Sequence, residues 1–250
     1  MNAETLFAKL QQSEFSSFAD SLIRHARPRV VLVRDSTNRN HGIGNSRLNN
    51  DPDLPADFIW PQHALGPYRF LAQINLSEFP DGMPNAPRTG LLSFFFQYDE
   101  NGECFWGDPG FVIARYFPTN QPLVRTRQPK EVDLGDPVAI TLQSGIDLPN
   151  FNPFNTVLRV TDWPLDKSQA GAYEKLHYSW HEVDDYLFGY PNNHTLGYDP
   201  TPGLEWQSFL SLESDEELHW CWHDGDRLVT FIESDKLAKG DFSDIRSDAG

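Results

Sequence analysis

A chain of 250 residues, 39% of them hydrophobic, is long enough to form one large domain or two half-size lobes. Its 20 basic and 36 acidic side chains leave a net charge of −16, which argues against nucleic acid and anionic membranes as partners, because both need a basic footprint. The sequence shows neither an apolar run of the roughly 20 residues that cross a bilayer nor an export signal at its start, so we expect a cytoplasmic protein.

The first segment, residues 1–28, is predicted to be helical. Apolar side chains recur at helical spacings, at Leu6, Leu10, Phe15, Phe18, Leu22 and Ile23. Pro28 then ends the pattern. We therefore expect one or two amphipathic helices before the first strand.

Residues 29–125 are predicted to form a first β half. Short apolar runs separated by Pro, Gly, Asn and Asp are typical of strands and turns. These runs are RVVLV at 29–33, FLAQINL at 70–76, GLLSFFFQ at 90–97 and GFVIARYF at 110–117. Because GLLSFFFQ is apolar on both faces, it is expected to be a central strand.

A connecting region, residues 126–185, and a second β half, residues 186–250, complete the chain. The segment 168–186 is rich in Ala, Leu and charge, which predicts a second helix. The strand pattern returns from Trp206 onward.

The two β halves resemble each other at a nearly constant offset. FLAQINL lies over WQSFLSL at 206–212 with an offset of 136, and the same offset places GLLSFFF over DRLVTFI at 226–232. LNNDP at 48–52 lies over LFGYP at 187–191 with an offset of 139. Another echo, between the Trp-x-Asp turns at Trp106 and Trp222, has an offset of 116 and is interpreted as local. We therefore predict a mainly β (α+β) fold in one compact unit, with duplicated sheet halves related by a pseudo-twofold axis that cover each other's apolar faces.

Several blocks of the sequence together resemble the YwqG-like (DUF1963) family. The blocks are SRLNNDPDLP at 46–55, WP at 60–61, GPYRFLAQINL at 66–76 and GLLSFFF at 90–96, then LFGYP at 187–191 and DFSD at 241–244. One departure is Asn49-Asn50, where the family usually has two glycines. Asn is the non-glycine residue that best tolerates a left-handed backbone, so the turn is expected to survive.

The resemblance implies a mostly β, internally duplicated fold with helical additions, and it implies no established reaction or cofactor. Some members of the family look like antidotes encoded beside polymorphic toxins. This association transfers no catalytic residue to the chain.

The side chains with metal-binding or nucleophilic chemistry are few. His177 and His181 stand four residues apart, which would place both imidazoles on one helix face, but the Glu of a zinc protease motif is absent. His219, Cys221 and His223 are expected to share one face of a half-buried strand rather than to bind a metal. Cys104 and Cys221 are expected to be thiols, and no nucleophile motif is present. We assign no catalytic, cofactor-binding or metal-binding residue.

A cluster of acidic residues in the second half suggests binding instead. Residues 201–250 contain four basic and twelve acidic side chains. Six of the acidic residues lie within residues 213–226, directly after the predicted strand at 206–212. These are the predicted partner-binding residues: Glu213, Asp215, Glu216, Glu217, Asp224 and Asp226.

Two functions from different classes follow from these observations. In the first, the chain is a non-catalytic immunity protein (antitoxin) that docks the acidic loop onto a basic toxin, such as a nuclease. In the second, it is a small-molecule-binding protein or an enzyme that uses a cleft between the two halves.

Overall fold

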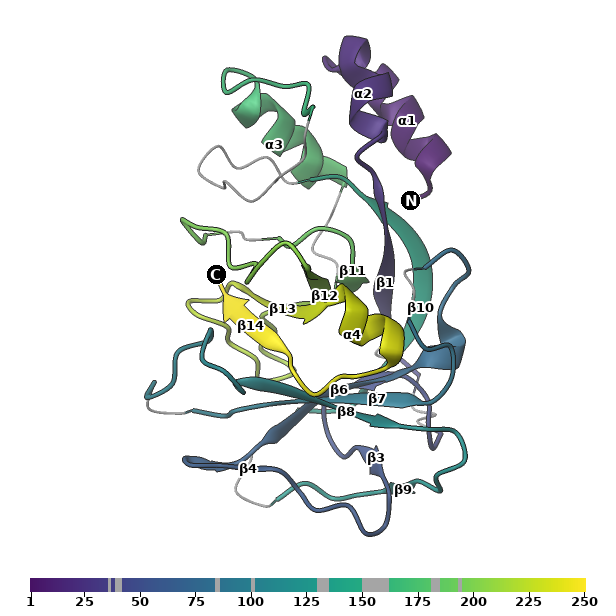
Figure 1. The fold of residues 1–250 in the computed structure, drawn as a ribbon, viewed down its shortest axis with the longest axis vertical. Coiled ribbons are helices and arrows are strands. Elements are labelled where there is room, and N and C mark those ends of the chain that lie inside the picture. Colours follow the sequence, from purple (N-terminus) through teal and green to yellow (C-terminus); the bar gives the residue numbers. More distant parts are fainter. Residues whose placement is uncertain are drawn as a thin grey trace.

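The computed structural model describes residues 1–35, 37–38, 42–83, 86–99, 102–129, 135–149, 162–180, 185–192 and 195–250. Its centre is one antiparallel sheet of ten strands, in the order β14-β13-β12-β11-β1-β10-β2-β6-β7-β8 (Figure 1). From edge to edge these strands are Arg246–Ala249, Arg227–Glu233, Trp206–Glu213, Tyr186–Phe188, Arg27–Asp35, Val138–Asp147, Arg47–Leu48, Arg69–Asn75, Leu91–Phe96 and Val112–Phe117. The predicted mainly β fold is confirmed.

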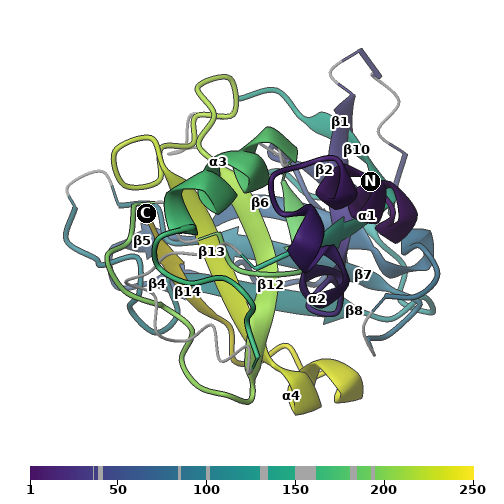
Figure 2. The same ribbon diagram turned by 90° about the horizontal axis from the view of Figure 1, so that it is seen from above.

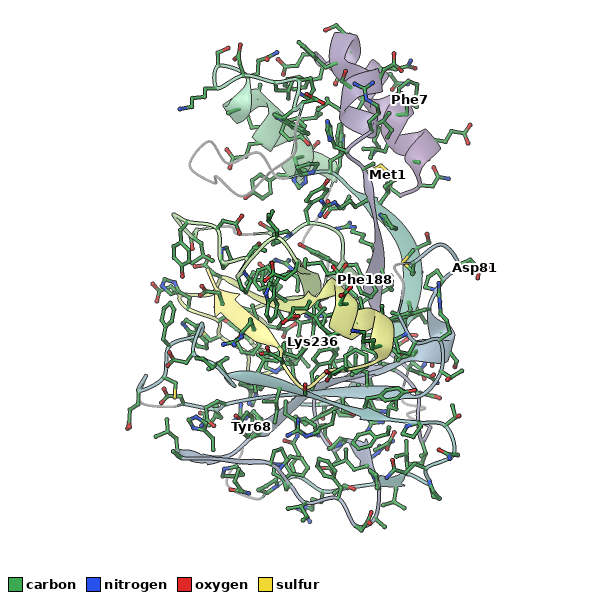
Figure 3. The ribbon with its side chains drawn as sticks, viewed as in Figure 1. Met1, Phe7, Tyr68, Asp81, Phe188 and Lys236 are labelled. Carbon is green, nitrogen blue, oxygen red and sulfur yellow. The ribbon has the colours of Figure 1, made fainter. Side chains whose placement is uncertain are left out.

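The two ends of the sheet curl over each other and enclose the main core. Aromatic rings meet across the two layers: the ring centroids of Phe94 and Phe209 are 5.4 Å apart, and those of Phe96 and Trp222 are 5.1 Å apart. Figure 1 shows β12, β13 and β14 above β6, β7 and β8. Phe188, labelled in Figure 3, lies in the same core and contacts both Phe79 and Phe209. Rings from both ends of the sheet therefore fill the space between the layers.

β1 and β10 join the two predicted β halves. β1, in the first half, pairs with β11 of the second half, and β10, in the connecting region, pairs with β2 of the first half. Long antiparallel pairing between β1 and β10, from Arg27 opposite Asp147 to Asp35 opposite Ala139, joins the two halves into one sheet. We call the place where β1, β11 and β12 meet the β1 corner, and the place where β10, β2 and β6 meet the β10 corner.

The two corners share a hydrogen-bond pattern. In the β1 corner the N–H of Leu32 donates to the carbonyl of Asp185 (2.8 Å), whose side chain accepts the N–H of Glu213 (2.9 Å). In the β10 corner the N–H of Ile140 donates to the carbonyl of Ser46 (3.4 Å), whose hydroxyl accepts the N–H of Asn75 (2.8 Å). These matched bonds are what a duplicated unit would leave, and the duplication itself stays a prediction.

Each corner also turns through a pair of left-handed residues. In the β10 corner these are Asn49 and Asn50, with φ of 60° and 63°, and in the β1 corner they are Phe188 and Gly189, with φ of 66° and 68°. The expectation that Asn49 and Asn50 preserve this turn is therefore confirmed. The left-handed region costs Asn less than it costs most other side chains, so the turn needs no glycine here.

Helices gather at the end of the sheet where β1 begins and β10 ends (Figures 1 and 2). They are α1 (Ala3–Gln11), the 3-10 turn η1 (Ser16–Phe18), α2 (Ala19–Ile23) and α3 (Ala170–Trp180). Asn2 caps α1 by accepting the N–H of Thr5 at 2.9 Å. The buried residues Leu6, Leu10, Leu22 and Tyr173 pack together with Leu148, so the predicted helical segments are confirmed. Pro28 was expected to end the helical pattern, and it lies in β1.

β7 is buried on both faces, as its sequence predicts. Leu92, Phe94 and Phe96 face the main core. Leu91 and Phe95 face a smaller apolar cluster under the loops that contain β3 (Asp53–Leu54), β9 (Val124–Arg125), β4 (Gln62–His63) and β5 (Gly66–Pro67). The remaining elements are η2 (Leu76–Glu78) and α4 (Ser234–Lys239). No helix in the described part of the chain has the length and apolar character needed to cross a membrane.

Candidate functional site

The acidic residues predicted from the sequence lie on the connection between β12 and β13, which we call the acidic loop (residues 213–226). Trp220 and Trp222 anchor it, because both indoles are buried in the main core. The ring centroids of Trp222 and Trp106 are 6.2 Å apart, so the two similar Trp turns contact each other although they lie in different connections. Paired backbone bonds of 2.8 Å between Asp215 and Trp220 close the tip of the loop.

Three of the six predicted residues stabilise the loop itself. Glu213 forms an ion pair with the buried Arg227, with Oε2 2.5 Å from the guanidinium. Asp215 pairs with Arg34 and accepts the N–H of Leu218 at 3.0 Å. Asp226 accepts the hydroxyl of Thr195 at 2.8 Å. Because Glu213 and Asp215 are paired with arginines and Asp226 is hydrogen-bonded within the fold, these three contribute less to an external partner than the sequence suggests.

The other three predicted residues are exposed to solvent. Glu216 and Glu217 lie at the tip of the acidic loop, and the side chain of Asp224 is 94% exposed in the turn that follows Trp222. The exposed carboxylates therefore lie in two places, the tip of the acidic loop and a separate turn, and they do not form one continuous row.

A hollow of about 390 Å³ lies beside the tip. Its wall combines the acidic side chains Asp136 and Glu217 with apolar surface from Pro137, Val138 and Leu218, and it is completed by Gly135 and His219. The tip is held against this wall, because Asn49 donates to the carbonyl of Leu218 at 3.3 Å and a side chain at Gly135 would overlap the carbonyl of Glu217. An apolar wall with carboxylates at its rim fits the stem and head of a lysine or arginine.

The base of the acidic loop is fixed by a buried carboxylate that the sequence analysis missed. Asp185 is 4% exposed, accepts the N–H of Glu213 and pairs with Arg34. Burial raises the pKa of Asp185, and the charges of Arg34 and Arg227 only partly offset this effect. Arg34 thus contacts two carboxylates, Asp185 and Asp215, and connects β1 to the acidic loop.

A second charged cluster, also missed, lies under the β10 corner. Asp53 is fully buried and pairs with Arg47 at 2.8 Å and with Arg125 at 2.7 Å. It also accepts the N–H of Gly44 and the amide of Gln73, both at 2.8 Å. Burial acts to raise the pKa of Asp53, but the bonds from Arg47 and Arg125 outweigh it and lower the pKa to about 2. Both oxygens of the Asp53 carboxylate are bonded to groups within the fold, so we assign Asp53 a structural role.

The histidines and cysteines do not assemble into a metal site within the described residues, where no group of three His, Cys, Asp or Glu side chains is suitably placed. His177 lies on α3 and its Nε2 contacts the carbonyl of Leu148 at 3.0 Å. His181 lies outside the described residues.

The expected strand over residues 219–223 is wrong. This segment is a turn, in which His219 and His223 have φ of 55° and 49°, both left-handed. The two indoles point into the core, whereas His219, Cys221 and His223 are exposed. Strand alternation was inferred from the polar and apolar residues, but the same alternation arises here because Trp220 and Trp222 anchor a loop. Both cysteines are free thiols; Cys104 is partly buried and Cys221 is exposed.

A family model described as "Domain of unknown function (DUF1963)" matches residues 46–248. This range includes β2, the acidic loop and most of β14, so the sheet and both corners lie largely within it. No curated protein matches the chain.

Proposed function

We propose that this chain, which belongs to the DUF1963 family, is a non-catalytic protein-binding module whose acidic loop docks onto a basic protein. In this proposal the protein acts in the cytoplasm as an immunity protein, and its partner is a basic toxin such as a nuclease, whose substrate cleft it covers. The net charge of −16 would steer a positively charged partner toward it.

The observation that carries the proposal is the hollow beside the tip of the acidic loop. Glu216 and Glu217 are exposed there, and Glu217 and Asp136 flank apolar surface from Pro137, Val138 and Leu218. Such a site offers an anchor point for one lysine or arginine, and anchoring residues of this kind dominate the energy of protein interfaces. The loop is also preorganised by its two buried indoles, which lowers the entropy lost on binding.

The alternative function places a small molecule or substrate in a cleft between the halves. Packed rings such as Phe94, Phe209 and Trp222 fill the space between the two sheet layers. This packing favours the binding module over the alternative.

The test combines capture of a partner with charge reversal at the tip. Only exposed carboxylates are reversed, in the variant E216K/E217K, because Glu213 and Asp215 are held in ion pairs that stabilise the fold. The matched control is E14K/E174K, which makes the same change in net charge at two exposed positions in the helical region. Wild type, tip variant and control would each be used as bait in a low-salt lysate of the native cells, with mass spectrometry of the eluates.

We expect a basic protein that wild type and control retain and the tip variant loses. With that partner purified, the association rate constant should fall at least about tenfold in the tip variant and should fall with added salt for wild type. A partner retained equally by all three baits, or one with an acidic surface, would contradict the proposal.

A further inference from the structure

The sheet has a gap beside β10. β2 pairs with β10 only at Val138 and Ala139, and the N–H of Ile140 makes one more hydrogen bond to Ser46. From Thr141 onward β10 is paired along one edge only, with β1, among the residues that the structure describes. A strand near the centre of the sheet therefore has a free edge over part of its length.

The alternation of the backbone identifies the groups on this edge. Successive residues of a strand direct their N–H and C=O groups to opposite edges. Because Ile140 donates toward β2, Leu142 and Ser144 face the same way, whereas Thr141 and Gln143 face β1. Within the described chain, the outward N–H and C=O groups of Leu142 and Ser144 have no backbone or side-chain partner.

A cavity of about 400 Å³ opens at the start of this edge. It is lined by residues 139–142 of β10, by Asn45, Ser46 and Arg47, and by Asn38 and Glu78. Figure 1 shows the connection that follows β6 passing beside β10, and Figure 3 labels Asp81 at its outer side. The volume of the cavity lies within the range of sites that bind ligands in proteins. We call the cavity and the free edge together the β10 slot.

The free edge has none of the usual protection against pairing. Natural sheets blunt their edges with charged side chains, proline or bulges. Residues 141–146 of β10 read TLQSGI, which contains no charge and no proline. Thr141, Gln143 and Ser144 are exposed, so an incoming chain can reach this part of the strand.

The charge of the cavity indicates what fits it. Arg47 is 1% exposed, and its guanidinium is held by Asp53 and the carbonyl of Asp51, so it offers no accessible charge to the cavity. Glu78 is the last residue of η2 and lines the cavity, and it has no ion pair in the part of the chain that the structure describes. The accessible charge of the slot is therefore negative.

We propose that the β10 slot binds an extended segment of a partner protein, which adds a strand beside Leu142 and Ser144 and places a lysine or arginine next to Glu78. Strand addition of this kind uses backbone hydrogen bonds for affinity and side-chain pockets for specificity. A second copy of the chain fits less well, because two molecules of net charge −16 repel and the edge offers no charge to offset this. The β10 slot is a different surface from the tip of the acidic loop, and the proposal does not depend on that function.

Amide hydrogen exchange measured by NMR on the protein alone tests the geometry first. The amides of Thr141 and Gln143 should exchange slowly, since they bond to β1, and those of Leu142 and Ser144 should exchange at least about tenfold faster. Equal protection of all four amides would overturn the proposal, because the edge would then be covered. Protection of Leu142 and Ser144 that grows with protein concentration would also overturn it, since the occupant would be a second copy.

The probe for binding is a short fluorescein-labelled peptide of alternating threonine and valine with one central lysine. Fluorescence polarisation should show saturable binding, and the bound peptide should slow exchange at Leu142 and Ser144 without changing Thr141 or Gln143. A peptide in which valine replaces the lysine should bind about tenfold more weakly. Binding that leaves the two amides unprotected, or equal binding of both peptides, would contradict the proposal.

Two variants separate the backbone contribution from the charge. S144P removes one outward N–H, and proline is tolerated on an edge whose N–H faces solvent, so the peptide affinity should fall about tenfold or more. The matched control S144T keeps the N–H and should bind like wild type. E78Q should weaken only the lysine peptide, and it keeps the test decisive if S144P does not fold. Unchanged affinity in both S144P and E78Q would overturn the proposal.

Discussion

The β1 corner and the β10 corner share a hydrogen-bond pattern, and one of the side chains in which they differ lies just beyond it. Arg34 is four residues past Val30, which pairs with Leu187. Leu142 is four residues past Val138, which pairs with Leu48. In the β1 corner Arg34 binds Asp185 and Asp215, whereas in the β10 corner Leu142 borders a cavity of about 400 Å³.

The difference shows that the backbone pattern alone does not determine whether a corner is closed. Both corners have an arginine paired with a buried aspartate, but the pairs lie at different places. In the β10 corner the pair is Arg47 with Asp53, and Arg47 belongs to β2. In the β1 corner the arginine, Arg34, belongs to the neighbouring strand, β1. From there it contacts both Asp185 and Asp215.

The largest effect is expected for removal of the charge beneath the β10 corner. D53N leaves Arg47 buried at 1% exposure without its carboxylate, and an uncompensated buried charge costs about 3–5 kcal/mol of unfolding free energy. The pKa of Asp53 is lowered from 3.8 to about 2, so its contribution is present above pH 3.8 and is lost as the pH falls toward 2. D53N should therefore also flatten the acid limb of the stability curve.

Urea unfolding of wild type and D53N across this pH range checks the prediction. The control is D57N, which removes an exposed carboxylate nearby and should change stability by less than about 0.5 kcal/mol. If D53N and D57N behaved alike, the cluster beneath the β10 corner would not stabilise the fold.

The second-largest effect on stability is expected when Arg34 of the β1 corner is replaced by leucine, the residue at the matching position of the β10 corner. R34L leaves Asp185 buried without its arginine and should lower the unfolding free energy by about 2–4 kcal/mol, somewhat less than a fully buried pair because Arg34 is 29% exposed. Burial already raises the pKa of Asp185, so R34L should raise it further, and the loss of stability should shrink as the pH falls through this raised pKa and the carboxyl becomes neutral.

The reciprocal variant, L142R, tests the other side of the comparison. An arginine there can reach Glu78 across the β10 slot, so L142R should change stability by less than about 1 kcal/mol and should block the lysine peptide. Equal destabilisation by R34L and L142R in thermal unfolding would mean that the corners do not differ as described.

The elements of the fold could largely be predicted from the sequence, because their signals are local. β7 was identified by its apolar residues on both faces, and α3 by its composition. The central pairing of β1 with β10 could not be predicted, since it joins residues more than 100 positions apart, such as Arg27 with Asp147.

The candidate site was predicted only in part for the same reason. The acidic loop was identified from its charge, but Glu213 and Asp215 were expected to be available to a partner. Arg34 lies 181 residues from Asp215, and no local pattern indicates that the two meet. The one available signal was the position of Arg34 at the end of an apolar strand, where a charged residue commonly has a partner.

A smaller effect is expected at the left-handed turn of the β1 corner. G189A places a side chain at φ of 68°, and its Cβ would lie 2.7 Å from Oδ2 of Asp147. Strain and overlap together should lower the unfolding free energy by about 2–3 kcal/mol. Thermal unfolding against G171A, an exposed glycine of α3 with open space around it, provides the control, since that change should stabilise slightly. A G189A protein as stable as wild type would show that this turn can relax.

The smallest effect is expected at the matching turn of the β10 corner. N50G relieves the cost of a left-handed side chain at φ of 63°, but it loses the bond from the Asn50 amide to the carbonyl of Gly135 at 3.1 Å and the bond that Asn50 Oδ1 accepts from the N–H of Asp51 at 2.8 Å. Because the relieved strain of about 1 kcal/mol offsets much of the lost hydrogen bonding, the unfolding free energy should fall by no more than about 1 kcal/mol. N50A keeps the strain and loses both bonds, so it should cost about 1 kcal/mol more than N50G. Equal unfolding midpoints for N50G and N50A would show that the left-handed backbone does not limit this turn, and the corners would then differ in their turns as well as in Arg34.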